Sequence, residues 1–458
     1  MRQVAKLFFS SLEKINDSCL PLCQYPFARR EEIADEADTA QGRMANMTVG
    51  IRHDDLRRRN RAMVIAAVRR AGQPSRTEIA ATTALSPSTI SAITADLIAE
   101  GILVESRSGD TTAARRGRPQ VAVRLSPAAA TIVTMVLSMN QLSAALIDYA
   151  GKTVAEERRK LPTLELPREA LIGEVAGILR ELIGAMPPDR RPILRIVFAI
   201  QGITDSGERK LLWSPITPHA DIDFASILEE EFGIPVTVEN DCNMIAVGLR
   251  WRNPERYARD FIAVLLSHGI GMGMVLRGEL FTGTQSSGGE FGHMIHRPDG
   301  ALCRCGRRGC IEAYAGNYAI WRNAKGLPET EAVARDVTDE DIRALADVAR
   351  KQPGPEREAF RIAGEAIGFG LGSLFALIDP APVAIVGHGA NAFDLMEKPM
   401  RDAIARTAGG VHSGAISFDT EVDEMPLIRE GCAMRALTFI DQEVFSPSQT
   451  PAVGRNVA

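Results

Sequence analysis

Residues 288–312 of this 458-residue chain read GGEFGHMIHRPDGALCRCGRRGCIE, and no other stretch says more about the protein. The stretch places three cysteines, Cys303, Cys305 and Cys310, within eight positions, and His293 precedes them. Three thiolates and one imidazole make up the four tetrahedral ligands of a closed, structural zinc site. We therefore predict that these four residues bind Zn²⁺.

The alternative is a group of buried free cysteines. Arg304, Arg307 and Arg308 lie between and beside the three cysteines, and such charged side chains disfavour an apolar core at this place. Seven cysteines in the whole chain are few, which suits a reducing compartment better than a disulfide framework, so we expect a cytoplasmic protein. The remaining cysteines have no partner spacing and are expected to be ordinary thiols: Cys19, Cys23, Cys242 and Cys432.

Two polar motifs accompany the cysteine motif. Glu239, Asn240 and Asp241 directly follow the strand-like run at 235–238, and the carboxyl ends of strands commonly line ligand crevices in α/β sheets. An adjacent Asn and Asp offer a donor and an acceptor to neighbouring sugar hydroxyls, although a polar helix cap would need the same residues. Glu290, set between glycines, could bind a diol.

Length and charge indicate more than one domain. A chain of 458 residues with 45% hydrophobic and 24% charged residues has an ordinary globular composition but exceeds the usual size of one domain. Residues 51–125 contain 13 Arg, no Lys and 7 acidic residues, a net charge of +6. Because the whole chain carries −5, the rest carries −11. A basic module is therefore joined to an acidic one, and no apolar run is long enough to predict a membrane span.

The basic module carries clear helix signals. Ser75 stands three residues before Glu78 and predicts a capping box at the start of a helix. Ser86 followed by Pro87 predicts a second N-terminus, because proline at the first helical position loses no hydrogen bond. Short strands are expected at 102–104 and 121–123.

The order helix, helix, tight turn, helix and β-hairpin predicts a winged helix-turn-helix, as opposed to a generic small helical domain. The third predicted helix carries small side chains that would let its backbone enter a major groove, and the hairpin loop carries an Arg-rich hook suited to phosphates. We expect a homodimer or homotetramer to bind double-stranded operator DNA. The candidate DNA-binding residues are Ser86, Ser88, Thr89, Ser91, Arg115, Arg116 and Arg118.

After residue 125 the pattern changes to alternating strands and helices, which predicts a mixed sheet flanked by helices. No internal repeat is visible in the sequence. The predicted organisation is a poorly ordered extension, a winged helix-turn-helix domain, an α/β domain of two lobes and a disordered tail, at residues 1–50, 51–125, 126–444 and 445–458.

The motifs GEFGH, CxCGxxGCxE and ENDCN together resemble the ROK family of sugar kinases and sugar-responsive repressors. The segments SRTEIA and RRGRP look like the transcriptional branch, typified by repressors of xylose and N-acetylglucosamine operons. The resemblance implies an actin-like, ribonuclease-H-like fold with two lobes and a structural zinc ion. It also implies that a sugar or sugar derivative would be contacted by Asn240, Asp241, Glu290, His293 and Glu312, with Asp241 in the place of the general base of a kinase.

One departure from the kinases of this family stands out. They carry an aspartate-x-glycine-glycine-threonine loop that accepts ATP phosphates, and the matching positions here are 136–140, which read VLSMN. Backbone N–H groups bind phosphates less well where Met139 projects a side chain. We therefore predict a DNA-binding regulator, a repressor of carbohydrate uptake or catabolism genes, without enzymatic activity. The alternatives are an active sugar kinase joined to a DNA-binding module and a zinc protein without a ligand.

Overall fold

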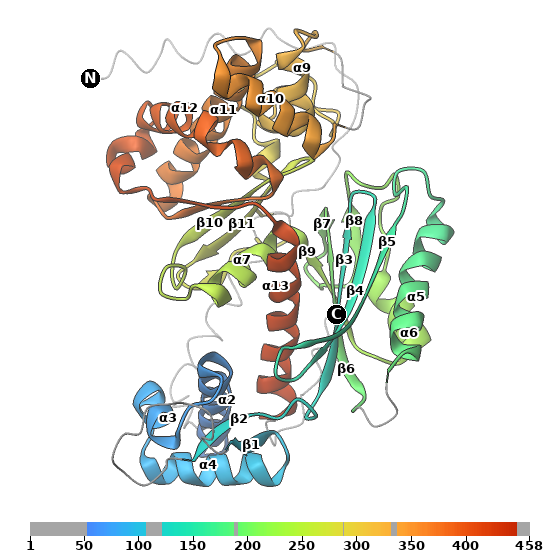
Figure 1. Ribbon diagram of the computed structural model, residues 1–458, viewed down its shortest axis with the longest axis vertical. Coiled ribbons are helices and arrows are strands. Elements are labelled where there is room, and N and C mark those ends of the chain that lie inside the picture. Colours follow the sequence, from blue (N-terminus) through green and yellow to red (C-terminus); the bar gives the residue numbers. More distant parts are fainter. Residues whose placement is uncertain (1–52, 107–120, 187–190, 287, 331–336, 447–458) are drawn as a thin grey trace, which may run out of the picture. The chain divides into compact units, whose positions relative to one another are not determined.

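The computed structural model describes residues 53–106, 121–186, 191–286, 288–330 and 337–446 (Figure 1). The predicted N-terminal extension, residues 1–50, lies outside these ranges. The same holds for Arg115, Arg116 and Arg118 of the predicted DNA-binding loop and for residues 447–458 of the predicted tail.

The described part of the N-terminal helical region contains three helices and a two-stranded antiparallel sheet: α2 (His53–Ala71), α3 (Arg76–Thr83), α4 (Pro87–Ala99), β1 (Leu103–Ser106) and β2 (Ala122–Leu125). Both predicted helix starts are confirmed. Ser75 and Glu78 form the reciprocal capping box of α3, and Ser86 caps α4 with Pro87 in its first turn. The predicted hairpin strands are present, shifted along the chain by one or two residues.

The first lobe is built on a five-stranded mixed sheet in the order β5-β4-β3-β6-β9. Helices α5 (Arg168–Gly184) and α6 (Phe224–Phe232) cover one face, and α13 (Glu424–Phe439) packs on the other (Figure 1). The strands are β3 (Thr131–Ser138), β4 (Gln141–Asp148), β5 (Thr153–Lys160), β6 (Ile193–Ile200) and β9 (Val236–Asn240). A small hairpin, β7 (Ile203–Thr204) with β8 (Leu211–Trp213), follows β6.

The second lobe repeats this sheet with the order β12-β11-β10-β13-β14. In both sheets the first three strands pair antiparallel and the last two add in parallel. The internal repeat that is invisible in the sequence is therefore plain in the strand order. The strands are β10 (Phe261–Leu266), β11 (Ile270–Leu276), β12 (Glu279–Leu280), β13 (Val383–Val386) and β14 (Phe418–Glu421).

Helices cover both faces of the second sheet. Helix α7 (Asp241–Arg252) packs against β10 and β11 on one face. A helical cluster with its own hydrophobic core fills the other face: α8 (Glu312–Ala315), α9 (Asn317–Ala324), α10 (Asp339–Lys351), α11 (Pro355–Ile378), α12 (Phe393–Ala405), and the short helical turns η1 (Phe291–His293), η2 (His388–Ala392) and η3 (Ala408–Ala415). By length and composition α11 could cross a membrane, but half of its most apolar window is buried in this core.

Helices α7 and α13 hold the two lobes together by very close packing. A Cβ atom on Gly248 of α7 would lie 2.4 Å from the Leu427 carbonyl oxygen, and one on Gly431 of α13 would lie 1.9 Å from that of Met244. Contacts this short exclude any side chain, so the two glycines set the distance between the helices.

A buried ion pair fixes the N-terminal helical region to the lobes. Arg69 of α2 donates to both carboxylate oxygens of Asp441, at 3.0 and 2.9 Å, and to the Tyr149 carbonyl. The Tyr149 hydroxyl donates to the same carboxylate, and its ring meets that of Phe445 edge to face. Asp441 lies in η4 (Ile440–Val444), a π-helical turn after α13. At the start of the predicted tail, Phe445 packs on Tyr149 and Ser446 is buried.

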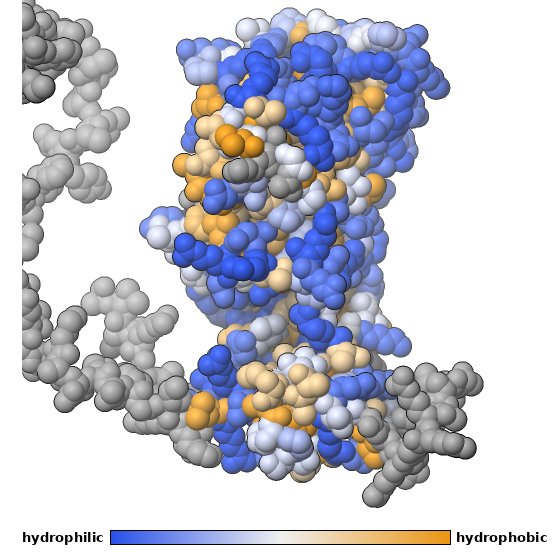
Figure 2. Space-filling model, turned by 90° about the vertical axis from the view of Figure 1, so that its left-hand side faces the viewer, coloured by the Kyte–Doolittle hydropathy of each residue, from blue (hydrophilic) through white to orange (hydrophobic). Residues whose placement is uncertain are grey.

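The face of the protein shown in Figure 2 is mostly hydrophilic. On the face shown in Figure 2, apolar side chains form patches among charged and polar ones. Scattered patches of this kind are ordinary on a protein surface in contact with water.

Candidate functional site: a polar cavity beside a cysteine and histidine cluster

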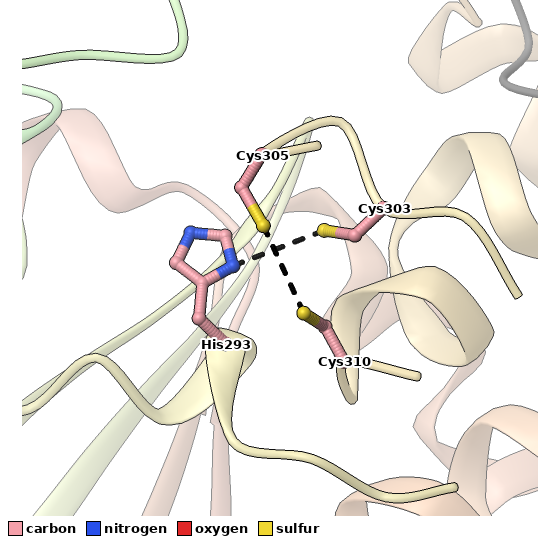
Figure 3. A group of neighbouring side chains, drawn as sticks. All are labelled: His293, Cys303, Cys305 and Cys310. Carbon is pink, nitrogen blue, oxygen red and sulfur yellow. Dashed lines mark hydrogen bonds between the residues drawn. The ribbon is translucent and has the colours of Figure 1, made fainter. Parts of the chain in front are cut away.

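The four predicted zinc ligands lie together. His293 comes from η1 and the three cysteines from the loop that follows, and all four side chains point toward one another (Figure 3). Their ligand atoms lie within 4.8 Å of one another, with 3.8 Å between Cys305 Sγ and Cys310 Sγ and 3.8 Å between Cys303 Sγ and His293 Nδ1. Two sulfurs bound to one tetrahedral zinc ion at about 2.3 Å would lie about 3.8 Å apart. The donor set and its spacing therefore fit this metal.

The loop conformation depends on one glycine in particular. Gly309 has φ +82°, and a Cβ atom there would lie 1.7 Å from the Arg297 carbonyl oxygen. Only glycine allows this approach, which brings Cys310 back beneath the other two sulfurs. The glycine spacing in the cysteine motif is thus a requirement of the loop geometry.

The five residues predicted to contact a sugar line one small cavity of about 60 Å³. They come from three places far apart in the sequence: Asn240 and Asp241 from the junction of β9 and α7, His293 from η1 with Glu290 just before it, and Glu312 from the start of α8. The strand-end position of the first pair matches the expectation from the sequence.

Asn240 and Asp241 are held in place by the backbone around them. Asn240 is the N-cap of α7, since its Oδ1 accepts from the Asn243 N–H at 3.0 Å, and its Nδ2 donates to the Gly202 carbonyl at 2.7 Å. Asn240 therefore serves both as the helix cap and as a lining residue of the cavity. Its Oδ1 and Nδ2 can each form one more hydrogen bond. Asp241 is 5% exposed and accepts from the Cys242 N–H through Oδ1.

Burial dominates the electrostatics of Asp241. Loss of solvation is the largest influence and, together with the nearby Glu424 carboxylate, outweighs the Cys242 hydrogen bond, so that the pKa of this carboxyl is raised from 3.8 to about 7. The neighbouring Glu239 has a different surrounding. Its carboxylate accepts from Arg435 of α13 at 2.7 Å and does not line the cavity.

His293 connects the cysteine cluster to the cavity. Its Nδ1 faces Cys303, while its Nε2 lies 3.9 Å from Glu290 Oε2. A metal ion bound at Nδ1 would fix the ring and leave the Nε2 proton directed at Glu290. Glu312 is also anchored, because its Oε2 accepts from the Ile270 N–H at 3.2 Å.

Sequence reasoning missed the apolar wall of this cavity. Trp213, from the hairpin β7–β8, lines it together with Ile203 and Pro215, and the indole meets the His293 ring edge to face at 6.0 Å between centroids. An aromatic wall opposite a few polar groups is typical of small-molecule sites. A three-residue strand is too short to show a periodic pattern. Only a comparison of aromatic and polar positions across the whole chain could have suggested that Trp213 lines this cavity.

A second cavity of about 350 Å³ adjoins the first and shares Gln201, Asp241 and Leu265 with it. Here the chain departs from a phosphate-binding loop. Ser138 pairs with Gln141, so that positions 139 and 140 form a tight hairpin turn, in which Asn140 has φ +57°. The Asn140 N–H donates to Thr163 Oγ1 at 3.2 Å and is not available to a phosphate.

Two mixed sheets of the same strand order, with a polar cavity and a cysteine–histidine cluster, define a two-lobed α/β protein. The ROK family model matches residues 137–417, more than half of the chain, and the protein belongs to the ROK family. Its fold is thus the actin-like two-lobed α/β fold, preceded by a helical region.

Relatives in this family include named regulators. The chain is 25% identical over 358 residues to the xylose repressor of Caldicellulosiruptor bescii, covering 77% of this chain and 88% of that protein. It is 25% identical over 340 residues to the DNA-binding transcriptional dual regulator NagC of Escherichia coli, covering 74% and 82%.

Solved structures show the same fold. A ROK family transcriptional regulator, described as a homologue of the E. coli MLC protein, matches 86% of this chain and all of its own with a TM-score of 0.69 at 19% identity. A ROK family glucokinase from Streptomyces griseus, solved with glucose and AMPPNP, matches 66% of this chain and 98% of its own with a TM-score of 0.54 at 22% identity.

Proposed function

We propose that this protein is a sugar-responsive, DNA-binding transcriptional regulator, acting as a repressor of carbohydrate uptake or catabolism genes in the cytoplasm. Two observations in one chain carry the proposal. All five predicted sugar contacts line one cavity, and the Asn140 N–H of the adjoining hairpin donates to Thr163, so it is not available to a phosphate. Two xylose repressors and the transcriptional dual regulator NagC match over most of their length, which supports the same function.

The effector is a monosaccharide or a simple derivative of one. Each buried sugar hydroxyl needs a hydrogen-bonding partner, and carboxylates accept from vicinal hydroxyls with charge-assisted strength. Asp241 and Glu290 would accept, His293 would donate from Nε2, and Trp213 would face the apolar side of the ring. A cavity of about 60 Å³ is smaller than the roughly 300 Å³ of ordinary ligand sites, so sugar entry requires movement of the lining segments.

The N-terminal helical region acts as a winged helix-turn-helix. Helix α4 buries Ile90, Ile93 and Leu97 and exposes Ser88 and Ser91 on its other side, as a recognition helix requires. Ser86 and Thr89 are engaged with each other at the helix start, where a phosphate could join them. Two copies in a homodimer would place two such helices on a pseudo-palindromic site.

Removal of the exposed hydroxyls of α4 should change sequence preference. The double variant Ser88→Ala, Ser91→Ala should lose discrimination by about 1–3 kcal/mol at one or two base pairs, because it removes groups that read base edges. Sites selected from random duplexes by the wild type and the variant would be compared. Ser373→Ala, which removes an exposed hydroxyl of α11, is the matched control. Identical selected sites would exclude α4 as the recognition helix.

The loop outside the described residues should contribute affinity without specificity. Replacing Arg116 and Arg118 with alanine should weaken binding to all duplexes and lower the salt slope by about one for each phosphate that the variant no longer neutralises. Fluorescence anisotropy at several salt concentrations measures both quantities. An unchanged affinity and slope would contradict a role for this loop at DNA.

The sugar response and the kinase alternative can be tested together. A selected DNA site is titrated with protein in the presence of a sugar panel, and each sugar that changes DNA affinity is then assayed for ATP turnover. We expect a sugar-dependent change in DNA affinity and no turnover. Turnover at kinase-like rates would favour the sugar kinase joined to a DNA-binding module.

A further inference from the structure

A large cavity, with a volume of about 510 Å³, lies away from the sugar site. It is formed where α2 of the N-terminal helical region meets α7 and α13 of the lobes, and neither the predicted sugar contacts nor the predicted DNA contacts line it. The volume falls within the range of about 300–1,000 Å³ that is usual for small-molecule sites. We refer to it as the junction cavity.

One face of α2 forms one wall of the junction cavity. Arg59, Met63, Ala66 and Arg70 recur at intervals of three and four residues and therefore share a face of the helix. The apolar residues of α2 that are fully buried, Val64, Ile65 and Val68, belong to the hydrophobic core instead. The cavity-lining face is thus turned toward the lobes.

The floor of the junction cavity is apolar and its rim is cationic. Met63, Val247, Trp251 and Met434 supply the apolar surface. Three arginines stand around it without a carboxylate within 4 Å among the described residues: Arg59, Arg70 and Arg250. The one acid of the lining, Asp441, is already bound by Arg69.

The arginines keep unused donors. The Arg70 guanidinium lies over the Trp251 ring, 5.6 Å from its centroid, and Arg250 donates one N–H to the Gly278 carbonyl. A guanidinium offers five donors in a planar fork that matches a carboxylate, sulfonate or phosphate, and the remaining donors face no anion of the described residues. The cavity therefore combines apolar contact area with positive charge that lacks a counter-charge.

We propose that the junction cavity is a second effector site, which binds an organic anion with an aromatic or apolar body. The apolar part would contact Trp251 and Met63, and the acidic group would bind Arg70 and Arg250. Such a ligand would touch the N-terminal helical region through α2 and the second lobe through α7 at the same time.

Helix α7 gives this site a physical connection to the sugar cavity. It begins at Asp241, which lines the sugar cavity, and its last residues include Arg250 and Trp251, which line the junction cavity. Twelve helical residues span roughly 18 Å. A ligand that binds one arrangement of α7 and α2 better than another would shift the position of the DNA-binding region, and the coupling to DNA affinity would be reciprocal.

The test uses 1-anilinonaphthalene-8-sulfonate as a fluorescent organic anion on the full chain. We expect one saturable site per chain, with affinity at least tenfold weaker in the variant Arg70→Gln, Arg250→Gln. The matched controls are Arg58→Gln and Arg252→Gln, since these arginines are neighbours on α2 and α7 but pair with Glu443 and Glu430. Both controls should bind the probe within twofold of the wild type.

A second measurement requires no variant. N-phenyl-1-naphthylamine has the same ring system without the sulfonate and should bind at least tenfold more weakly. Saturating sulfonate probe should also change affinity for the selected DNA site at least fivefold in the wild type and not in the double variant. Equal binding of the neutral analogue, or probe binding unaffected by the double variant, would overturn the proposal. So would a double variant that lowers the salt slope of DNA binding and leaves probe binding unchanged, because the arginines would then face DNA.

Discussion

Replacing Cys305 with serine should remove the metal ion and lower the stability of the protein by several kcal/mol. The proposed zinc site uses His293, Cys303, Cys305 and Cys310, whose ligand atoms lie within 4.8 Å of one another. A serine hydroxyl has nearly the size of the thiol but is a far weaker zinc ligand, so the change reports loss of the metal and not of packing. Since metal binding contributes to folding free energy, the melting temperature should fall by about 10 °C or more.

The sugar response should fall with it. His293 presents one ring nitrogen to the cysteines and the other to Glu290, so that loss of the ion frees the ring and the segment that carries this carboxylate. Elemental analysis, calorimetry and sugar titration measure the three effects. Cys432→Ala is the matched control, because its sulfur is buried outside the cluster and its metal content should not change.

Chelation provides the decisive comparison for the metal site. A chelator should lower the melting temperature of the wild type toward that of Cys305→Ser and leave the variant unchanged. A metal-free wild type with an unchanged melting temperature would contradict a structural role for zinc, and a full zinc equivalent in the variant would exclude Cys305 as a ligand.

Replacing Asp241 with asparagine should weaken the sugar response at least a hundredfold and leave DNA binding without sugar intact. The carboxylate is buried, lines both adjoining cavities, and is proposed to accept from sugar hydroxyls. An amide keeps the size and the hydrogen bond from the Cys242 N–H but loses the charge. Asp223→Asn, at the N-cap of α6, is the matched control. An unaffected sugar response would place the effector site elsewhere.

The same variant should be more stable than the wild type at high pH. Burial raises the pKa of Asp241 from 3.8 to about 7, so the folded chain holds a proton that the unfolded chain has released. Wild-type stability therefore falls as the pH rises from about 4 to about 7, and the asparagine variant lacks this cost. The gain should grow over that range to a few kcal/mol at pH 8. If the variant and the wild type had the same melting temperature at pH 8 as well as at pH 4, the predicted gain in stability would be contradicted.

Several parts of the fold could be predicted because their signals lie within a few residues of each other. Ser75 and Glu78 satisfy each other's backbone N–H groups across one helical turn, and within a helix Pro87 is tolerated in the first turn but not in the interior. The spacing of Cys303, Cys305 and Cys310 likewise predicts a loop that turns back on itself. This loop requires the positive φ of Gly309.

Other elements lacked a local signal. Strand β5 reads TVAEERRK and is polar because it lies at the edge of its sheet, and β14 reads FDTE at the edge of the other. Helix α13 packs on the first sheet and on α7 and has little apolar asymmetry between its sides, so its sequence has no clear stripe. The repeated strand order of the two lobes is not visible in the sequence, because it is defined by backbone hydrogen bonds between strands that are distant along the chain.

The sequence by itself determined the family motifs, the caps and the metal-ligand set, all of which depend on interactions within one turn or one loop. The family resemblance implied that Asp241, Glu290 and Glu312 meet at one ligand, but only the tertiary structure shows the cavity that they line and adds Trp213 to its wall. It alone placed Arg70 beside Arg250 at the junction cavity. These residues are separated by tens to hundreds of positions, and their meeting depends on how closely α7 and α13 pack and on which strands pair. Helix packing and strand pairing depend on the free energy of the whole core, and this free energy cannot be inferred from any short segment of the sequence.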